Sequence, residues 1–342
     1  MRFLWIFLLA FSASWILTGL LRRYALSKSL IDIPNVRSSH SIPTPRGGGV
    51  AVVITFLVAL VILWLMSFLE GTVVLALMGS GLLISIIGFI DDHGHIAARW
   101  RLISHFTAAV WVVFWLGGMP PFMLFGVELD IGLVGELFAV VAIVWLLNLY
   151  NFMDGIDGIA GIEALSVTIV AGMLMFHLSK LEGGGMVTLN ILLLSAVVGF
   201  LVWNFPPAKV FMGDAGSGFI GLMLGSLALY STHLEQQMLW VWSILLGVFI
   251  VDATYTLVRR LLRGDKVYEA HRSHAYQYAS RKFESHKLVT LSVLMINIFW
   301  LTPWASLVAL GFVDGSTGLL LAYIPLLGVA WYFRAGELEI NG

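Results

Sequence analysis

The stretch TVVLALMGSGLLISIIGFIDD, residues 72–92, indicates the class of fold. Its first 19 residues carry no charge, and two adjacent aspartates follow them. A helix needs about 20 mostly apolar residues to cross the hydrocarbon core of a bilayer. Similar stretches recur along the chain, and we expect about eleven spans, at residues 3–21, 48–68, 72–90, 102–118, 133–150, 158–178, 186–203, 217–231, 239–258, 289–312 and 317–333. The sequence therefore predicts an all-α polytopic membrane protein in which residues 1–342 form a single domain.

The composition agrees with this class and excludes several functions. Of the 342 residues, 59% are hydrophobic and 11% are charged. Arg22 and Arg23 follow the first apolar run, which lacks a convincing cleavage site, so we interpret it as a retained helix and not as a signal peptide. The absence of cysteine excludes disulfides, thiolate chemistry and cysteine metal sites. A net charge of −1 gives no bulk positive charge for binding nucleic acid.

Basic residues set the expected orientation, because Lys and Arg collect in the cytoplasmic loops of membrane proteins. With eleven spans, 17 of the 19 basic residues fall on one side, and only Arg2 and Lys180 fall on the other. We therefore expect a multi-pass protein with the N-terminus outside and the C-terminus in the cytoplasm. Anionic membrane lipids are expected partners of the basic loops.

The unusual motifs all fall in the loops assigned to the cytoplasm. In chain order they are PNVRSSHSIPTPRGGG (34–49), DDHGHIAARWR (91–101), NLYNFMDGIDG (148–158), NFPPAKVFMGDAGSG (204–218) and EAHRSHAYQ (269–277). Five loops that meet at one face of a helix bundle predict an active site at the cytoplasmic membrane surface.

Acidic residues stand at the ends of several expected spans. Asp91, Asp92 and Asp154 follow helix C-termini, whose partial negative charge disfavours further anions. Arg99 and Arg101 could compensate them, and a solvated acidic loop would need no compensation. More acids in the neighbouring inward loops favour a divalent metal ion.

Four polar side chains recur at three-residue intervals around the end of the fifth span. Asn148 and Asn151 lie on its last turns, and Asp154 and Asp157 lie just beyond. Steps of three residues drift by about 60° around an α-helix, so the four cannot share one narrow stripe. Gly155 and Gly158 let the backbone turn and approach a ligand closely. A polar turn between two spans is the alternative, but it would not need two asparagines within the helix.

The stretch FMGDAGSG, residues 211–218, precedes the eighth span. Its glycines before a helix N-terminus predict a phosphate cradle of backbone N–H groups. It is not a Walker A loop, because the Lys-Ser/Thr ending is missing. Asp214 within such a loop suits Mg²⁺, a hard cation that prefers carboxylate, phosphate and water oxygens.

Three further positions carry polar chemistry. His271, Arg272 and His274 suit metal binding, acid–base chemistry or phosphate contact, and a solvated basic loop is the alternative. Arg46 stands where a phosphate-bearing lipid head could meet it. Asp252 lies about two turns inside the ninth span, where an acid is functional by default or orients its polar neighbours. Together with the acids, these groups indicate phosphoryl transfer from a water-soluble pyrophosphate to a lipid.

The ordered set PTPRGGG, DDHGHIAARWR, NLYNFMDGIDG, FMGDAGSG and HRSH resembles the polyprenyl-phosphate N-acetylhexosamine-1-phosphate transferases of glycosyltransferase family 4. The resemblance covers nearly the whole chain. It implies that undecaprenyl phosphate attacks the β-phosphate of a UDP-N-acetylhexosamine, which releases UMP and leaves a lipid-linked sugar pyrophosphate. It also implies a requirement for Mg²⁺, with Mn²⁺ as an alternative.

The resemblance also implies a role for each matching residue. Asp91 would bind or deprotonate the lipid phosphate, and Phe211 would stack on uracil. The implied catalytic residues are Asp91, Asp92, Asp154, Asp157 and His271. The implied substrate-binding residues are Arg46, Asn148, Asn151, Phe211, Arg272 and His274, and the metal ligands are Asp214 and Asp92. Direct displacement and a covalent aspartyl intermediate both remain open.

The loop HRSHAYQ lacks the run of consecutive histidines of the peptidoglycan branch and looks more like the O-antigen-initiating branch, which serves lipopolysaccharide synthesis. That branch uses UDP-N-acetylglucosamine, UDP-N-acetylquinovosamine or UDP-N-acetylfucosamine. The sequence leaves open the choice of sugar and whether the protein is a homodimer. A secondary transporter of an anionic solute is the alternative function, although such proteins place charges near mid-membrane in repeated halves. A lipid-binding scaffold would not need carboxylates at one face.

Overall fold

The computed structural model describes residues 2–28, 30–33, 42–94, 96–179, 184–266 and 271–338. Residues 34–41 of the first motif, residues 269–270 of the last, and Lys180 lie outside this range. Every predicted site residue lies within it.

The described chain is almost wholly helical, which confirms the all-α class. The elements in chain order are α1 (Arg2–Ser27), β1 (Ile31–Asp32), β2 (Thr44–Pro45), α2 (Val50–Leu65), α3 (Gly71–His93), α4 (Ala98–Leu116), β3 (Phe122–Leu124), β4 (Val127–Leu129), α5 (Gly132–Met153), α6 (Ile159–Ser179), α7 (Gly184–Asn204), α8 (Asp214–Leu234), α9 (Met238–Leu245), α10 (Gly247–Leu262), α11 (Ala275–Phe283), α12 (His286–Ile296), the π-helix η1 (Asn297–Leu301), α13 (Thr302–Ala309) and α14 (Gly315–Tyr332).

Each expected span coincides with one helix or with a run of adjoining helices. By length and apolar composition, eight helices in the described part of the chain can cross a membrane, and nine if the bent pair α9 and α10 is one span. The other two expected spans correspond to α2, which has 16 residues, and α4, whose Ile103, Val110 and Phe114 are exposed apolar side chains. The protein is therefore a polytopic membrane protein. The number eleven and the orientation stay predictions.

Two spans expected to be straight are interrupted. The range 239–258 contains a bend of 70° between α9 and α10. The range 289–312 contains η1 between α12 and α13. Pro303 is the second residue of α13, two positions after η1 ends, and because proline has no backbone N–H it cannot continue the regular i to i−4 ladder. Asp252 therefore lies on the separate helix α10, beyond the bend, and not within a straight ninth span.

Helix α8 is the centre of the bundle. Of its spanning window 89% is buried, against 17% for α1. It packs against α3, α5 and α9. Its small residues make this contact close: a Cβ on Gly221 would lie 2.8 Å from the carbonyl oxygen of Leu146 on α5. Small residues at helix interfaces are the usual means of close packing in membranes, where apolar burial itself gives little drive.

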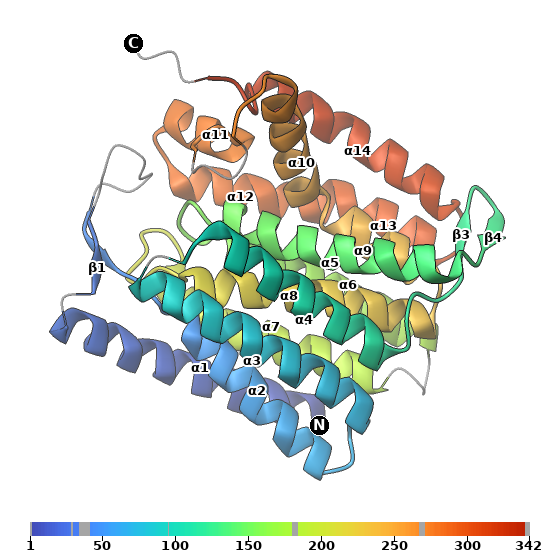
Figure 1. The fold of residues 1–342 in the computed structure, drawn as a ribbon, viewed down its shortest axis with the longest axis horizontal. Helices are drawn as coiled ribbons and strands as arrows, with labels where there is room; N and C mark the ends of the chain where they lie inside the picture. Colours follow the sequence, from blue (N-terminus) through green and yellow to red (C-terminus); the bar gives the residue numbers. More distant parts are fainter. Residues whose placement is uncertain are drawn as a thin grey trace.

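The two ends of the bundle differ. The hairpin of β3 and β4 lies at one end, and β1 and α11 lie towards the other (Figure 1). At the second end β1 pairs with β2, and the backbone after β2 bonds to the segment before α8 through Gly48 N–H to Phe211 O at 2.9 Å. The first, third and fourth motifs meet there.

The expected orientation can be tested by cysteine labelling, because the chain has no cysteine of its own. Glu70 precedes α3 and Arg99 lies in the first turn of α4, and both are exposed. We expect a membrane-impermeant maleimide to label Glu70→Cys in intact cells and Arg99→Cys only after permeabilisation. The reverse pattern would invert the topology.

Candidate active site

Asp92 joins the end of α3 to the start of α8. Its Oδ1 accepts the backbone N–H of Asp214 at 2.9 Å, and its Oδ2 accepts that of Ala215 at 3.2 Å. These are N–H groups of the first turn of α8, which have no partner within their own helix. The N-terminal end of the helix also carries partial positive charge, which stabilises the carboxylate.

Glycines make this junction sterically feasible. Gly213 has φ +79°, and a Cβ there would lie 2.7 Å from Asp92 Oδ2. A Cβ on Gly88 would lie 2.6 Å from the Cα of Ala215, and one on Gly216 would lie 2.6 Å from the Cα of Gly49. The glycines thus serve close packing of α2, α3 and α8. The prediction that they leave an open phosphate cradle is wrong for the N–H groups of Asp214 and Ala215, which bind Asp92.

Arg46 lies between two carboxylates. Its Nε is 3.0 Å from Asp92 Oδ1, and its Nη2 is 2.7 Å from Asp214 Oδ1. Burial would lower the pKa of Arg46, but the carboxylates of Asp214 and Asp92 outweigh it, and the net shift is upward. The guanidinium is therefore a fixed positive charge, and charge-assisted bonds of this kind are among the stronger ones in proteins.

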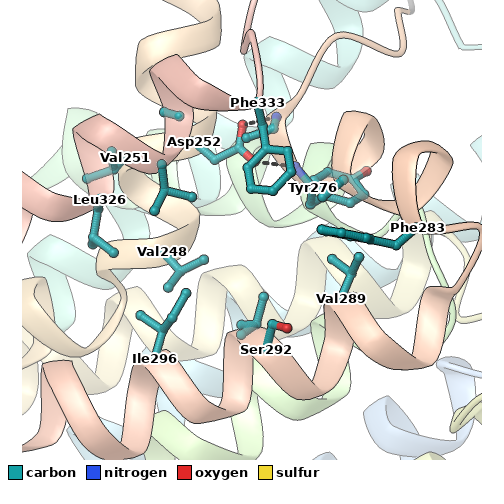
Figure 2. A pocket seen from close by; sticks show the side chains of 15 residues that line it. Val248, Val251, Asp252, Tyr276, Phe283, Val289, Ser292, Ile296, Leu326 and Phe333 are labelled. Carbon is teal, nitrogen blue, oxygen red and sulfur yellow. Dashed lines mark hydrogen bonds between the residues drawn. The ribbon is translucent and has the colours of Figure 1, made fainter.

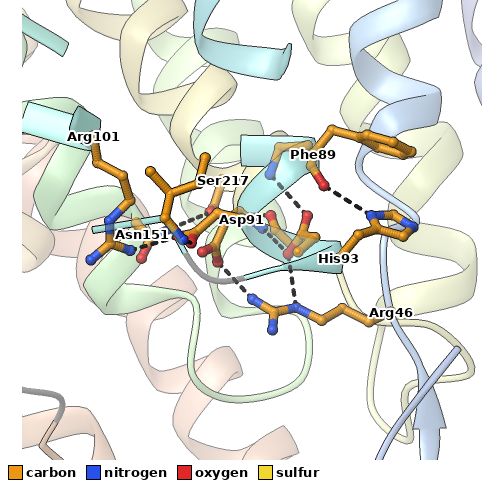
Figure 3. Close-up of polar contacts among 12 residues, drawn as sticks. Arg46, Phe89, Asp91, His93, Arg101, Asn151 and Ser217 are labelled. Atoms are coloured by element: carbon orange, nitrogen blue, oxygen red, sulfur yellow. Dashed lines mark hydrogen bonds and ion pairs between the residues drawn. The ribbon is translucent and has the colours of Figure 1, made fainter. Parts of the chain in front are cut away.

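Asp91 turns away from Asp92 towards α4. Its Oδ2 is 2.8 Å from Arg101 Nη1, and its Oδ1 accepts the backbone N–H of Ile96 at 2.9 Å. Figure 3 shows Arg46 and Arg101 approaching the end of α3 from different sides. The adjacent aspartates therefore belong to different contacts, and each has its own arginine.

The polar residues at the end of α5 and just beyond it contact different partners, as their spacing predicts. Asn151 donates to Ser217 Oγ on α8 at 3.1 Å, and Asn148 donates to the carbonyl of Val144 at 2.7 Å. Asp154 ends α5. Burial raises the pKa of Asp154 well above its ordinary value, and the nearby carboxylate of Asp214 adds to the rise.

Asp157 holds three segments together. Its Oδ1 lies 3.2 Å from His286 Nδ1 at the start of α12, and its Oδ2 accepts the backbone N–H of Ala208 at 2.9 Å. Its own carbonyl accepts from Thr290 Oγ1 at 2.8 Å. Both carboxylate oxygens thus have protein partners, which gives Asp157 a structural role beside the catalytic one that the sequence predicts.

Asp252 organises the histidine segment. Its carboxylate accepts the backbone N–H groups of Ala275 and Tyr276 at 2.9 and 3.0 Å (Figure 2). It also lies 3.2 Å from Nδ1 of the buried His274. These contacts agree with the second of the two expectations for Asp252, that it orients its polar neighbours. Figure 2 also shows the apolar cavity of about 290 Å³ beside it, lined by side chains such as Val248, Ile296 and Leu326.

His271 stacks on His274 with ring centroids 4.9 Å apart, and its Nδ1 lies 2.9 Å from Ser273 Oγ. Burial lowers the pKa of His271 to about 3, and the neighbouring His274 and Arg260 contribute to the fall. At neutral pH the His271 ring is thus uncharged in this conformation. The carbonyl of the intervening Arg272 accepts from Arg281 at 3.1 Å.

Two cavities flank the acidic residues. The smaller, about 170 Å³, lies between α3, α4, α5 and α8, and its polar lining comprises Asp91, Arg101, His105, Asn148, Asn151 and Asp214. Its apolar lining includes Leu102 and Phe152, which are 48% and 40% exposed. The larger, about 590 Å³, is lined by more polar side chains, Asp157 and Phe211 among them. Six of the predicted site residues therefore line one or other of these cavities, and the other six, Arg46, Asp92, Asp154, His271, Arg272 and His274, line neither.

The donor set suits a hard divalent cation. In the described part of the chain, no three His, Asp or Glu side chains are placed to hold a metal ion. Mg²⁺, however, is commonly bound by one or two carboxylates together with phosphate and water oxygens. Asp92 and Asp214 converge on one positive group, Arg46, so they are the residues that could hold such an ion.

Sequence reasoning missed two polar residues at these cavities. His105 stands one turn after Arg101 on α4, and His286 begins α12. Neither belongs to a recognisable motif. The only local signal for His286 is Ser285, whose side chain accepts the N–H of Leu288 as the cap of α12.

Comparison with known proteins agrees with this arrangement. The family model for glycosyl transferase family 4 matches residues 73–232, which run from α3 to α8. A probable undecaprenyl-phosphate N-acetylglucosaminyl 1-phosphate transferase of Bacillus subtilis (strain 168) is 26% identical over 297 residues, covering 83% of this chain and 79% of that protein.

Two other relatives extend the comparison. A decaprenyl-phosphate N-acetylglucosaminephosphotransferase of Mycobacterium leprae is 27% identical over 348 residues, covering 92% of this chain and 85% of that protein. A phospho-N-acetylmuramoyl-pentapeptide-transferase of Bacillus mycoides is 26% identical over 265 residues, covering 74% and 80%. These matches support placing the chain with the polyprenyl-phosphate N-acetylhexosamine-1-phosphate transferases of glycosyl transferase family 4.

The dual role of Asp157 can be tested by comparing two substitutions. Asp157→Ala removes the acceptor of Ala208 N–H and the partner of His286, and we expect it to lower the free energy of unfolding by about 1–3 kcal/mol. Asp157→Asn keeps an acceptor and a hydrogen-bonding partner, so its thermal stability in detergent should match the wild type.

Asp130→Ala is the control, because Asp130 is exposed and its Oδ1 accepts a local bond from the backbone N–H of Gly132. Equal melting temperatures for Asp157→Ala and the control would rule out the structural role. Loss of turnover in a stable Asp157→Asn protein would show that the charge itself is needed.

Proposed function

We propose that the protein transfers N-acetylhexosamine 1-phosphate from a UDP-sugar to undecaprenyl phosphate. The observation that carries this proposal is the pair of unlike cavities, each lined by acidic residues of the predicted site. The smaller one has an apolar, exposed rim and a polar base that includes Asp91 and Asp214, which suits an amphiphile. The larger one suits a water-soluble nucleotide, since pockets for such ligands are about 300–1,000 Å³.

The reaction joins the two substrates at phosphorus. An oxygen of the lipid phosphate attacks the β-phosphorus of the UDP-sugar, and the bond from that phosphorus to the bridging oxygen breaks. UMP leaves with the bridging oxygen, and the lipid keeps the sugar pyrophosphate. Such reactions depend mainly on positioning and on charge neutralisation.

The residues of the chain divide this work. Asp91, fixed by Arg101 and Ile96 N–H, lies at the base of the smaller cavity and would orient or deprotonate the lipid phosphate. Arg46, already beside Asp92 and Asp214, would neutralise charge that develops on the phosphates. Phe211 in the larger cavity offers a ring on which uracil could stack. We propose Mg²⁺ at Asp214 and Asp92, where it would polarise phosphate oxygens and shield their charge.

We further propose that the lipid product begins an O-antigen of lipopolysaccharide in the bacterial inner membrane. The loop HRSHAYQ supports this assignment. The relatives include a decaprenyl-phosphate N-acetylglucosaminephosphotransferase and a phospho-N-acetylmuramoyl-pentapeptide-transferase. The assignment to the O-antigen branch therefore depends on the loop alone. No observation favours the transporter, because Asp252, the acid expected at depth, caps α11.

Nucleotide release tests the reaction. Purified protein in detergent receives undecaprenyl phosphate, Mg²⁺ and, one at a time, UDP-N-acetylglucosamine, UDP-N-acetylquinovosamine and UDP-N-acetylfucosamine. We expect UMP only when lipid and metal are both present. Asp214→Asn should lower kcat by about 10²–10³-fold, the usual effect of losing one electrostatic group at a reacting centre. Release of UDP would instead indicate transfer at the sugar carbon.

The metal proposal has a test that does not depend on turnover. Arg46→Gln leaves Asp92 and Asp214 without their shared cation. We expect it to lower stability in EDTA by on the order of 1 kcal/mol, a small value because the Arg46 side chain is 40% exposed.

Added Mg²⁺ should restore the melting temperature of Arg46→Gln more than it raises that of Arg99→Gln, a control on exposed α4. Equal responses of the two variants to Mg²⁺ would contradict a metal site at Asp92 and Asp214.

A further inference from the structure

The larger cavity has a basic wall that no motif contains. The end of α11, the following turn and the start of α12 contribute to its lining. The residues are Arg281, Glu284, Ser285, His286 and Lys287. On the facing side are Asp157 and Phe211, from the segments before α6 and α8, with Thr44 of β2 nearby in the lining. The cavity thus combines the Phe211 ring, the Asp157 carboxylate and the basic side chains of Arg281 and Lys287. A ring can stack on a nucleotide base, a carboxylate can accept hydrogen bonds from it, and basic side chains can bind its phosphates.

His286 fixes the carboxylate of this cavity. Its Nδ1 lies 3.2 Å from Asp157 Oδ1, and both side chains are largely buried, at 19% and 14% exposure. The same Nδ1 accepts the backbone N–H of Asp157 at 3.4 Å when it is unprotonated, and donates to the carboxylate when it carries a proton, so His286 contacts Asp157 in either state. Because Asp157 Oδ2 is held by Ala208 N–H, the carboxylate has one orientation relative to the 206–208 segment that leads to Phe211.

Lys287 adds a positive charge beside this pair. In the described part of the chain, no carboxylate lies within ion-pair distance of Lys287. A basic residue in the first turn of a helix is electrostatically unfavourable. Asp157 contacts His286, whereas Lys287 has no such ion pair among the described residues and lines the cavity, where a bound anion could pair with it.

We propose that the first two residues of α12 recognise the nucleotide half of the donor: His286 is a positioning residue that orients Asp157, and Lys287 contacts the nucleotide phosphate. This inference rests on the proposed function. It assigns the α11–α12 turn to donor binding and leaves the lipid phosphate to the cavity lined by Asp91 and Arg101.

The matched pair Lys287→Met and Lys282→Met tests the contact. Lys282 lies five residues earlier, outside the cavity, and its Nζ bonds to Tyr332 Oη at 2.9 Å. We expect Lys287→Met to raise the KM for the UDP-sugar about tenfold, which is the effect of about 1.4 kcal/mol. The KM for undecaprenyl phosphate should stay within about twofold, and Lys282→Met should change neither.

Titration of the purified proteins with UMP reports binding without turnover. The Kd for UMP should rise in Lys287→Met by a factor similar to that of the KM. If the wild type binds UMP but releases none from any UDP-sugar, the proposed reaction fails while the binding site stands. If Lys287→Met binds UMP as tightly as Lys282→Met does, the inference fails whatever the reaction.

Two variants of His286 test the positioning role. His286→Gln keeps an N–H donor that can reach Asp157, whereas His286→Leu removes it. We expect His286→Leu to raise the KM for the UDP-sugar without changing that for the lipid, and His286→Gln to recover most of the loss. Equal behaviour of the two variants, or a fall in kcat alone, would overturn this role.

Discussion

The contact between the Asp92 carboxylate and the first N–H groups of α8 determines how the site is assembled. It joins the N-terminal end of the deeply buried helix α8 to the C-terminal end of α3. Since Asp214 is the first residue of α8, the same contact places the Asp214 side chain beside Asp92. Arg46 lies between the two carboxylates and supplies a positive charge that both of them contact.

The bilayer explains why this chemistry gathers at helix ends. Inside the hydrocarbon core every backbone polar group must be satisfied within the protein, so the spans are regular helices of apolar residues. Functional side chains are cheapest where helices end and loops return. The α3 end, the α5 end and the α8 start meet there because glycines along α8 and its partners permit close approach. Packing in the middle of the bundle thereby fixes distances at its surface.

Much of this could be predicted from the sequence, for a physical reason. Apolar length decides a span, so each expected range coincides with a helix, and polar residues in inward loops indicated the site residues. The bend before α10 and the π-helix η1 were not predicted, because the sequence stays apolar across both. The partners escaped as well: the capping of α8 by Asp92 joins positions 122 residues apart, and the pairing of Asp157 with His286 joins positions in different loops.

The division into two cavities links this assembly to the proposed reaction. An in-line displacement needs the attacking and leaving oxygens on opposite sides of one phosphorus, so its two substrates must approach from different directions. Asp91 and Asp214 line the cavity with the apolar rim, whereas Asp157 and Phe211 line the polar one. The shared element is α8 with the segment that precedes it, since Phe211 belongs to that segment and Asp214 begins the helix. A ring and a carboxylate three residues apart therefore line different cavities, and the positive-φ turn at Gly213 between them lets the chain change direction there.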